Sequence, residues 1–340
     1  MALPRPPARL LGWRFACALT AVTLAAAVAA APSASSAGAS AAKPPPIRPR
    51  TTDRYKAMPM QTFFVPTRGG DVYVELIRPA VPAGKRVPVI LTYTPYAAFG
   101  ETAADGLANE YVPKGYARAL AHVVGTGNSG GCWDYGGLRE RNSAYDLVQY
   151  LGTRPWSNGK VGMVGGSYDG TTANMAAVAD PPHLATIVPE VAISAWYGYA
   201  YYGGIRYFLM DPAQRQGLII DEEGFDTPAG FTFGFGLVPP ADPQSDPAFA
   251  AHVSERPCPD VKAEQTERGY SFEPDYDRFW LDRDYARLGA NLAKRPGHGI
   301  TMLVQGGWRD YNVKHSESVR MFESVPVDRP STKKVEGVPF

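Results

Sequence analysis

The chain has 340 residues, of which 45% are hydrophobic and 20% charged, and its formal net charge is +1. No run of Lys and Arg with interleaved aromatic residues occurs, so neither the charge nor its distribution supports a nucleic-acid partner. The three cysteines and five histidines form no CxxC or HExxH spacing, and we predict neither a metal site nor a cofactor.

Residues 1–31 have the pattern of a signal peptide. Arg5, Arg9 and Arg14 precede the alanine-rich apolar segment Phe15–Ala31, whose small final residues offer cleavage sites. An uncleaved anchor is the alternative, but a stretch of mostly alanine this short is marginal for spanning a bilayer. We therefore predict a secreted protein without a stable membrane partner. Loss of the three arginines would change its net charge from +1 to about −2 (+1 − 3).

Residues 32–57 are rich in Pro, Ala and Ser without periodicity, which predicts a disordered linker. From residue 58 the chain alternates β-rich and helical patterns, beginning with a hairpin whose strands flank Thr-Arg-Gly-Gly. The predicted strands are Gln61–Pro66, Asp71–Pro79, Val87–Tyr93, Tyr116–Val124, Lys160–Val164 and Ala185–Val191, and the predicted helices are Asn142–Leu151 and Thr171–Ala179.

This alternation indicates an α/β fold with a parallel sheet that helices cover on both faces. It stops in residues 195–295, which are dense in Tyr, Phe, Gly and Pro, and resumes with a strand at Ile300–Gln305 and a helix at Val313–Glu323. We therefore divide the globular part into a first core segment (58–194), an insertion suited to a lid (195–295) and a second core segment (296–340).

The segment Gly165–Gly170 reads Gly-Gly-Ser-Tyr-Asp-Gly and joins a predicted strand to a predicted helix. A serine on such a turn is exposed above the sheet, beside the free N–H groups of the helix start, which can stabilise an oxyanion. Ser167 is therefore the candidate nucleophile. The alternative is a glycine-rich turn with an incidental serine, since Asp169 interrupts the simple G-x-S-x-G pattern.

Four segments closely resemble the X-prolyl dipeptidyl-peptidase family, namely Pro155–Gly170, Ile187–Gly204, Phe279–Tyr285 and Gly306–Glu317. The similarity extends from about Met60 onward. Cocaine-esterase-like acyl hydrolases belong to the same superfamily and share the motif G-x-S-Y-x-G. The resemblance implies an α/β-hydrolase fold with an inserted, largely helical cap and a further C-terminal β-sandwich domain.

The resemblance also implies roles for individual residues. Ser167 would be the nucleophile and Asp310 the triad acid, while the backbone N–H of Tyr168 and the hydroxyl of Tyr96 would form the oxyanion hole. A solvated loop position for Asp310 and an ordinary half-buried aromatic role for Tyr96 are the alternatives.

Two positions depart from the family pattern. His122 and Val124 stand where relatives carry Asp and Arg, and His122, which ends a buried strand, is expected to pack in the core. The triad also needs a histidine base, and the only one after Asp310 is His315, too near in sequence to reach from the acid to the serine. We expect His183, His252 and His298 to be surface or loop residues.

We therefore expect this chain to end before its base, the last part of the fold and the β-sandwich, with an open sheet edge and little turnover.

Three functions follow from these observations. The first is a secreted serine hydrolase that removes X-Pro dipeptides from peptides; the second is an esterase for small carboxylic esters; the third is an inactive truncated homologue. The insertion offers aromatics in Tyr197–Tyr207 and acids in Asp221–Glu223, with no single residue assigned as the substrate anchor. The pairing of Cys132 with Cys258 and the oligomeric state stay open.

Overall fold

The computed structural model describes residues 54–202, 205–206, 258, 260, 276–289, 299–310 and 312–324. The predicted signal peptide, nearly all of the predicted linker, most of the insertion and residues 325–340 lie outside these residues. In chain order the elements are β1 Gln61–Thr67, β2 Gly70–Ile77, β3 Val87–Thr94, η1 Tyr96–Phe99, α1 Gly106–Tyr111, η2 Val112–Lys114, β4 Ala117–His122, α2 Leu138–Gly152, β5 Ser157–Gly166, α3 Tyr168–Ala179, β6 Leu184–Glu190, α4 Trp196–Ala200, β7 Tyr201–Tyr202, β8 Ile205–Arg206, α8 Arg278–Leu281, α9 Tyr285–Gly289, β9 Thr301–Met302 and α10 His315–Ser324.

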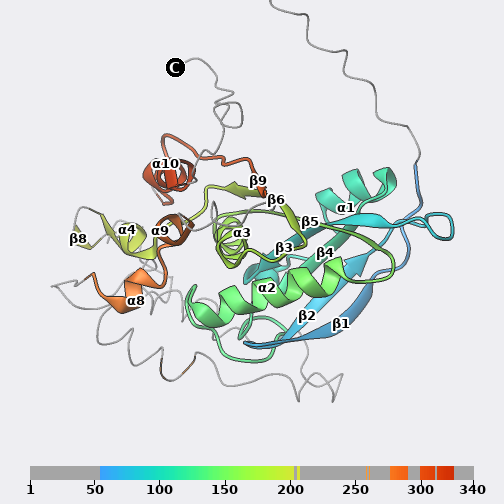
Figure 1. Cartoon of the computed structure of the whole chain (residues 1–340), viewed down its shortest axis with the longest axis horizontal. Helices are drawn as coiled ribbons and strands as arrows, with labels where there is room; N and C mark the ends of the chain where they lie inside the picture. The colour runs from blue at the N-terminus through green and yellow to red at the C-terminus, as the bar shows by residue number, and fades with distance from the viewer. Residues whose placement is uncertain are drawn as a thin grey trace, which may run out of the picture. The chain divides into compact units, whose positions relative to one another are not determined.

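One sheet organises the described part of the chain, with the strand order β1-β2-β4-β3-β5-β6-β9. The predicted N-terminal hairpin is confirmed, since β1 pairs with β2 in antiparallel register, and β2 is also antiparallel to β4. All remaining neighbours are parallel. Helix α2 connects β4 to β5 and α3 connects β5 to β6, as Figure 1 shows. The predicted α/β fold is therefore confirmed.

Helices lie on both faces of this sheet. Along β4, Ala119 and Ala121 face the main hydrophobic core, which also contains the buried residues of α2 and α3. Leu120 lies between them and faces the opposite side, where it packs with Ala108 of α1 in a second cluster. α1 therefore covers one face near β4, and α2 and α3 cover the other.

The last strand is shorter than the prediction of Ile300–Gln305. β9 pairs with β6 only at Thr301 and Met302, followed by an isolated bridge between Glu190 and Gln305. Gln305 N–H does donate to the carbonyl of Pro189, at 3.0 Å. Pro189 has no N–H to donate to the β9 side, so the hydrogen-bond ladder between β6 and β9 is interrupted there.

The described ends of the insertion pack against each other and into the main core. The backbone of Ala195 bridges to Asp284, and Ala286 N–H donates to the carbonyl of Ser194, at 3.1 Å. Trp196 and Tyr285 are fully buried in the main core cluster. The chain therefore leaves the sheet and returns to it at adjoining positions.

Helix α10 is fixed to this junction by a buried carboxylate. Glu317 accepts hydrogen bonds from Ser194 N–H, Ser194 Oγ and Ala195 N–H, at 2.8, 2.7 and 2.9 Å. Burial raises the pKa of Glu317, with these donors acting in the opposite direction. The second core segment is thereby connected to the start of the insertion.

Candidate active site

Ser167 lies on a strained turn between β5 and α3. Its φ of 56° and ψ of −120° are unusual for a residue with a side chain, and they turn the chain sharply out of the strand. Ser167 N–H donates to the carbonyl of Glu190 on β6, at 2.9 Å, and its own carbonyl accepts from Thr171 N–H, at 3.0 Å. The sheet on one side and the helix on the other hold the serine in this conformation.

Two glycines make the turn possible because backbone and helix approach closely there. A Cβ at Gly165 would lie 2.3 Å from the Cβ of Asp169, and one at Gly170 would lie 2.7 Å from the carbonyl oxygen of Gly165. Gly166 differs, since a Cβ at that position would meet no atom within 4 Å. The predicted need for small residues around Ser167 is therefore confirmed at Gly165 and Gly170.

The difference in space around Gly170 and Gly166 allows a matched pair of alanine variants to be compared. We expect Gly170→Ala to lower the free energy of unfolding by about 1–3 kcal/mol, because the added methyl group overpacks the turn. Gly166→Ala should change it by less than about 0.5 kcal/mol. Equilibrium urea denaturation measures both values, and equal stability of the two variants would contradict this account of the turn.

Two hydrogen-bond donors converge beside the serine hydroxyl. The hydroxyl of Tyr96 donates to Ser167 Oγ, at 3.0 Å, and the N–H of Tyr168 donates to the Tyr96 hydroxyl, at 3.2 Å. Burial raises the pKa of Tyr96 to about 12, so its phenol stays protonated at neutral pH and can donate. The structure thus brings together the serine and both predicted oxyanion donors.

The side chain of Tyr168 is held by residues that the sequence interpretation did not identify. Its hydroxyl accepts from Trp133 Nε1, at 2.8 Å, and donates to Glu140 Oε2, at 2.7 Å. Glu140 is fully buried, and burial followed by the charge of Asp134 raises its pKa well above the usual range. Glu140 lies on the buried face of α2, with Ala144 and Leu151. An acid on an apolar helix face is the signal that could have found it.

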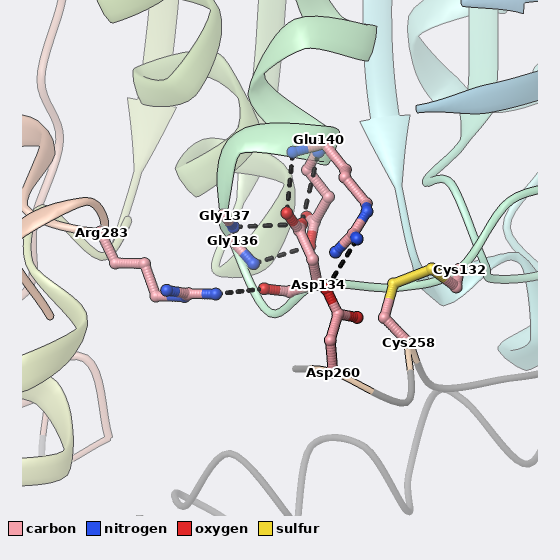
Figure 2. Close-up of a disulfide and its surroundings, with 9 residues drawn as sticks. Cys132, Asp134, Gly136, Gly137, Glu140, Cys258, Asp260 and Arg283 are labelled. Carbon is pink, nitrogen blue, oxygen red and sulfur yellow. Dashed lines mark hydrogen bonds and ion pairs between the residues drawn. A yellow bond between two sulfur atoms is a disulfide. The ribbon is translucent and has the colours of Figure 1, made fainter. Parts of the chain in front are cut away.

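The loop that carries Trp133 is tied to the insertion at several points, drawn in Figure 2. Cys132 and Cys258 form a disulfide across 126 residues of sequence, which answers the open question of their pairing. Asp134 accepts from three N–H groups at the start of α2, and Arg283 donates to the carbonyl of Asp134, at 2.8 Å. This loop therefore has a fixed conformation beneath Tyr168.

Asp310 follows β9 on the way to α10, as the sequence predicted. Its Oδ1 accepts from the N–H groups of Asn312 and Val313, at 2.9 and 3.0 Å. These bonds hold both residues in a turn, so α10 begins at His315 and not at the predicted Val313. Within the described residues no histidine nitrogen is hydrogen-bonded to Asp310, and its role as triad acid stays a prediction.

The described histidines have other environments. His122 is buried, as predicted, and its Nδ1 accepts from Asn128 N–H, at 2.9 Å. His183 Nδ1 lies 2.9 Å from the carbonyl of Gly159, and the ring of His315 lies 5.1 Å from that of Trp308. His252 and His298 lie outside the described residues, as do Tyr207 and the acids Asp221–Glu223.

Neither a metal-type cluster nor a membrane-crossing helix is found where the structure can be described. No three His, Cys, Asp or Glu side chains gather there in a way that could hold a metal ion. Within the same part of the chain, no helix has both the length and the apolar character needed to cross a bilayer.

The sheet topology and the serine on a strand-to-helix turn define an α/β-hydrolase fold. Solved structures share it. A CocE/NonD family hydrolase from Staphylococcus aureus has a TM-score of 0.57 at 20% identity, over 78% of this chain and 44% of that one. An α-amino acid ester hydrolase has a TM-score of 0.53 at 20% identity, over 82% of this chain and 47% of that one.

Residues 69–335 match the family model of the X-Pro dipeptidyl-peptidases (S15 family), and the chain belongs to this family. A Bacillus anthracis protein with a provisional Xaa-Pro dipeptidyl-peptidase name is 27% identical over 290 residues, which cover 75% of this chain and 43% of the relative. The chain spans less than half the length of the first curated relatives that it matches.

Proposed function

We propose that the chain carries the nucleophile and oxyanion hole of a serine hydrolase that removes X-Pro dipeptides from peptide N-termini. One observation carries the proposal: Ser167 Oγ, the Tyr96 hydroxyl and the Tyr168 N–H meet at the turn between β5 and α3. Family membership supports the choice of an X-Pro peptide as substrate.

In the proposed reaction, Ser167 Oγ attacks the carbonyl carbon of the proline, and a histidine base takes the hydroxyl proton. The oxygen of the resulting tetrahedral intermediate accepts hydrogen bonds from Tyr168 N–H and the Tyr96 hydroxyl. The C–N bond then breaks, the base protonates the leaving amine, and water hydrolyses the acyl-enzyme. Asp310 would orient this base. Among the described residues, no histidine is hydrogen-bonded to Asp310.

The same machinery would cleave an ester, because a serine and two oxyanion donors do not distinguish a nitrogen leaving group from an oxygen one. Esterase activity of the cocaine-esterase type is therefore the second candidate. A third possibility, an inactive homologue, is an outcome of the test below.

The test compares three substrates and a covalent probe on the full chain. Cleavage of Gly-Pro-p-nitroanilide with little cleavage of its N-acetylated form supports the dipeptidyl-peptidase. Equal cleavage of both contradicts it, and preferential hydrolysis of p-nitrophenyl butyrate favours the esterase. A folded sample that neither turns over substrate nor reacts with a fluorophosphonate at Ser167 would establish the inactive homologue.

We also propose that the protein is exported. The disulfide between Cys132 and Cys258 supports this proposal, because such bonds persist in oxidising compartments. The N-terminal pattern of residues 1–31 agrees with it. Recovery of the mature protein from the culture medium, starting after the predicted cleavage region, tests the proposal.

A further inference from the structure

A cavity of about 440 Å³ lies beside the serine turn, and its wall contains more acids than bases. It lies on the face of the sheet that α1 covers, between β3, β4 and residues 100–107. Ser167 is not among its lining residues, so it is distinct from the proposed reaction centre. The lining residues that matter here are Glu101, Asp105, Asp169, Arg118, Leu107 and Leu120.

The one arginine of this wall is already paired. Arg118, itself 2% exposed, makes an ion pair with Asp105, with its Nη2 2.7 Å from the carboxylate, and it also donates to the carbonyl of Ala119. Asp105 in turn accepts from Ala108 N–H at the start of α1, at 2.8 Å. Arg118 therefore binds Asp105 directly and acts on Asp169 only through its charge.

Of the two acids Glu101 and Asp169, Asp169 has the more unusual environment. It is only 6% exposed, and its buried Oδ1 has no hydrogen-bond partner. Burial and then the neighbouring charge of Glu101 raise the pKa of Asp169 well above its usual range, while Arg118 acts in the opposite direction. A buried carboxyl group with an unused acceptor is costly unless a proton or a cation satisfies it.

Glu101 gives the cavity an opening to solvent, because its side chain is exposed. Its Oε2 accepts from Thr94 Oγ1, at 2.6 Å, and its carboxylate also shares a hydrogen bond with the carboxyl group of Asp169, which raises the pKa of Asp169. Leu107 and Leu120 provide an apolar wall nearby. The cavity thus combines two acidic groups, an apolar surface and an entrance.

We propose that this cavity binds an aliphatic primary ammonium group, with its charge between Glu101 and Asp169 and its alkyl stem against Leu107 and Leu120. An ammonium has three N–H donors, which suit the unused acceptor of Asp169 and the oxygens of Glu101. A divalent metal fits less well, because no metal-type cluster occurs among the described residues. The volume also exceeds what a single ion needs. The inference does not depend on the proposed function.

A ligand bound in the cavity would affect Tyr96 of the oxyanion hole, because a short chain of hydrogen bonds connects the two. Thr94 Oγ1 donates to Glu101 and accepts from the backbone N–H of Tyr96, at 2.9 Å. The charges of Asp169 and Glu101 also contribute to the raised pKa of Tyr96. A bound ammonium would offset these charges and make the Tyr96 hydroxyl a stronger donor.

The test is a calorimetric titration of the full chain with n-butylammonium chloride at pH 8, with n-butanol and sodium chloride as controls. We expect saturable binding in the millimolar range for the amine and none for either control. Asp169→Asn and Glu101→Gln should each weaken binding at least tenfold, whereas Glu110→Gln, at an exposed position paired with Lys114, should not. No saturable binding, or equal binding by Asp169→Asn, would overturn the proposal.

A second ligand separates two sources of the ammonium group. If Nα-acetyl-lysine methylamide binds as tightly as butylamine, the site accepts a lysine side chain of a polypeptide; if only butylamine binds, it takes a free amine. Either result supports the proposal. The Glu101→Gln variant keeps the test valid if Asp169→Asn does not fold, because Glu101 is exposed.

The pH dependence of stability gives an independent check on Asp169. Its folded pKa is raised, so its contribution is present below about pH 4, the unfolded value, and is lost as the pH rises through the folded pKa. Asp169→Asn removes that loss. Without amine, the stability of the Asp169→Asn variant relative to the wild type should therefore increase from pH 4 upward. The titratable and charged neighbours of position 169 are the same in both proteins: Glu101, Arg118, Asp105 and Tyr96. A constant difference across this range would contradict a buried carboxyl group with a raised pKa.

Discussion

Replacement of Ser167 with alanine is expected to abolish labelling by a fluorophosphonate and, where a histidine base completes the triad, to remove catalysis on the order of 10⁶-fold. The reason is that Ser167 Oγ is the hydroxyl that accepts from Tyr96, on the strained turn where the Tyr168 N–H also lies. Intact-protein mass spectrometry measures the labelling, with Ser324→Ala, a substitution at the end of α10, as the matched control. Labelling of the Ser167→Ala variant at the wild-type rate would show that the nucleophile lies elsewhere.

Tyr96→Phe should have a smaller effect, which separates the oxyanion donor from the nucleophile. Loss of one such donor costs on the order of 10²–10³ in rate. Because the pKa of Tyr96 is raised to about 12, its phenol remains a donor at all lower pH values. The wild-type labelling rate should therefore show no inflection from Tyr96 below about pH 11. A rate unchanged by Tyr96→Phe would assign this tyrosine to packing only.

Removal of the disulfide is the second change with a large expected effect. The double variant Cys132→Ala, Cys258→Ala should lose about 2–5 kcal/mol of unfolding free energy, since the bond closes a loop across 126 residues. Urea denaturation of both proteins, with and without dithiothreitol, provides the measurement. Reduction should destabilise the wild type and leave the double variant unchanged. Equal midpoints for all four samples would show that the bond contributes nothing to stability.

Much of the sheet could be predicted because its residues follow simple periodicities. The strands β1 to β6 and the helices α2 and α3 lie within a few residues of the predicted ranges. Buried strands such as β3 read as continuous apolar runs, and α2 places Ala144, Leu147 and Leu151 on one buried face. The boundaries that moved did so for local reasons, such as the missing N–H of Pro189 beside β9.

The helices α1, α4, α8 and α9 were not predicted, and each is short. In so few residues the apolar spacing of a helix cannot repeat, so tertiary contacts decide the conformation. Trp196 and Tyr285 illustrate this, because both are buried through packing between segments that are distant in sequence.

The residues of the candidate site also fall into those that the sequence predicted and those that it did not. Ser167 and its glycines are marked by a local motif, and Tyr96 and Tyr168 followed from the family resemblance. Trp133 and the disulfide support the site through contacts between separate parts of the chain, which no spacing in the sequence reveals, whereas Glu140 is marked by its place on an apolar helix face.

The surroundings of Tyr168 also set the order in which the site can be completed during synthesis. Its ring packs 5.5 Å from that of Trp196, and Trp196 Nε1 donates to the hydroxyl of Tyr285. A ribosome that has just finished the serine turn has not yet translated either aromatic residue. The turn therefore gains its full support only after Tyr285 has been translated.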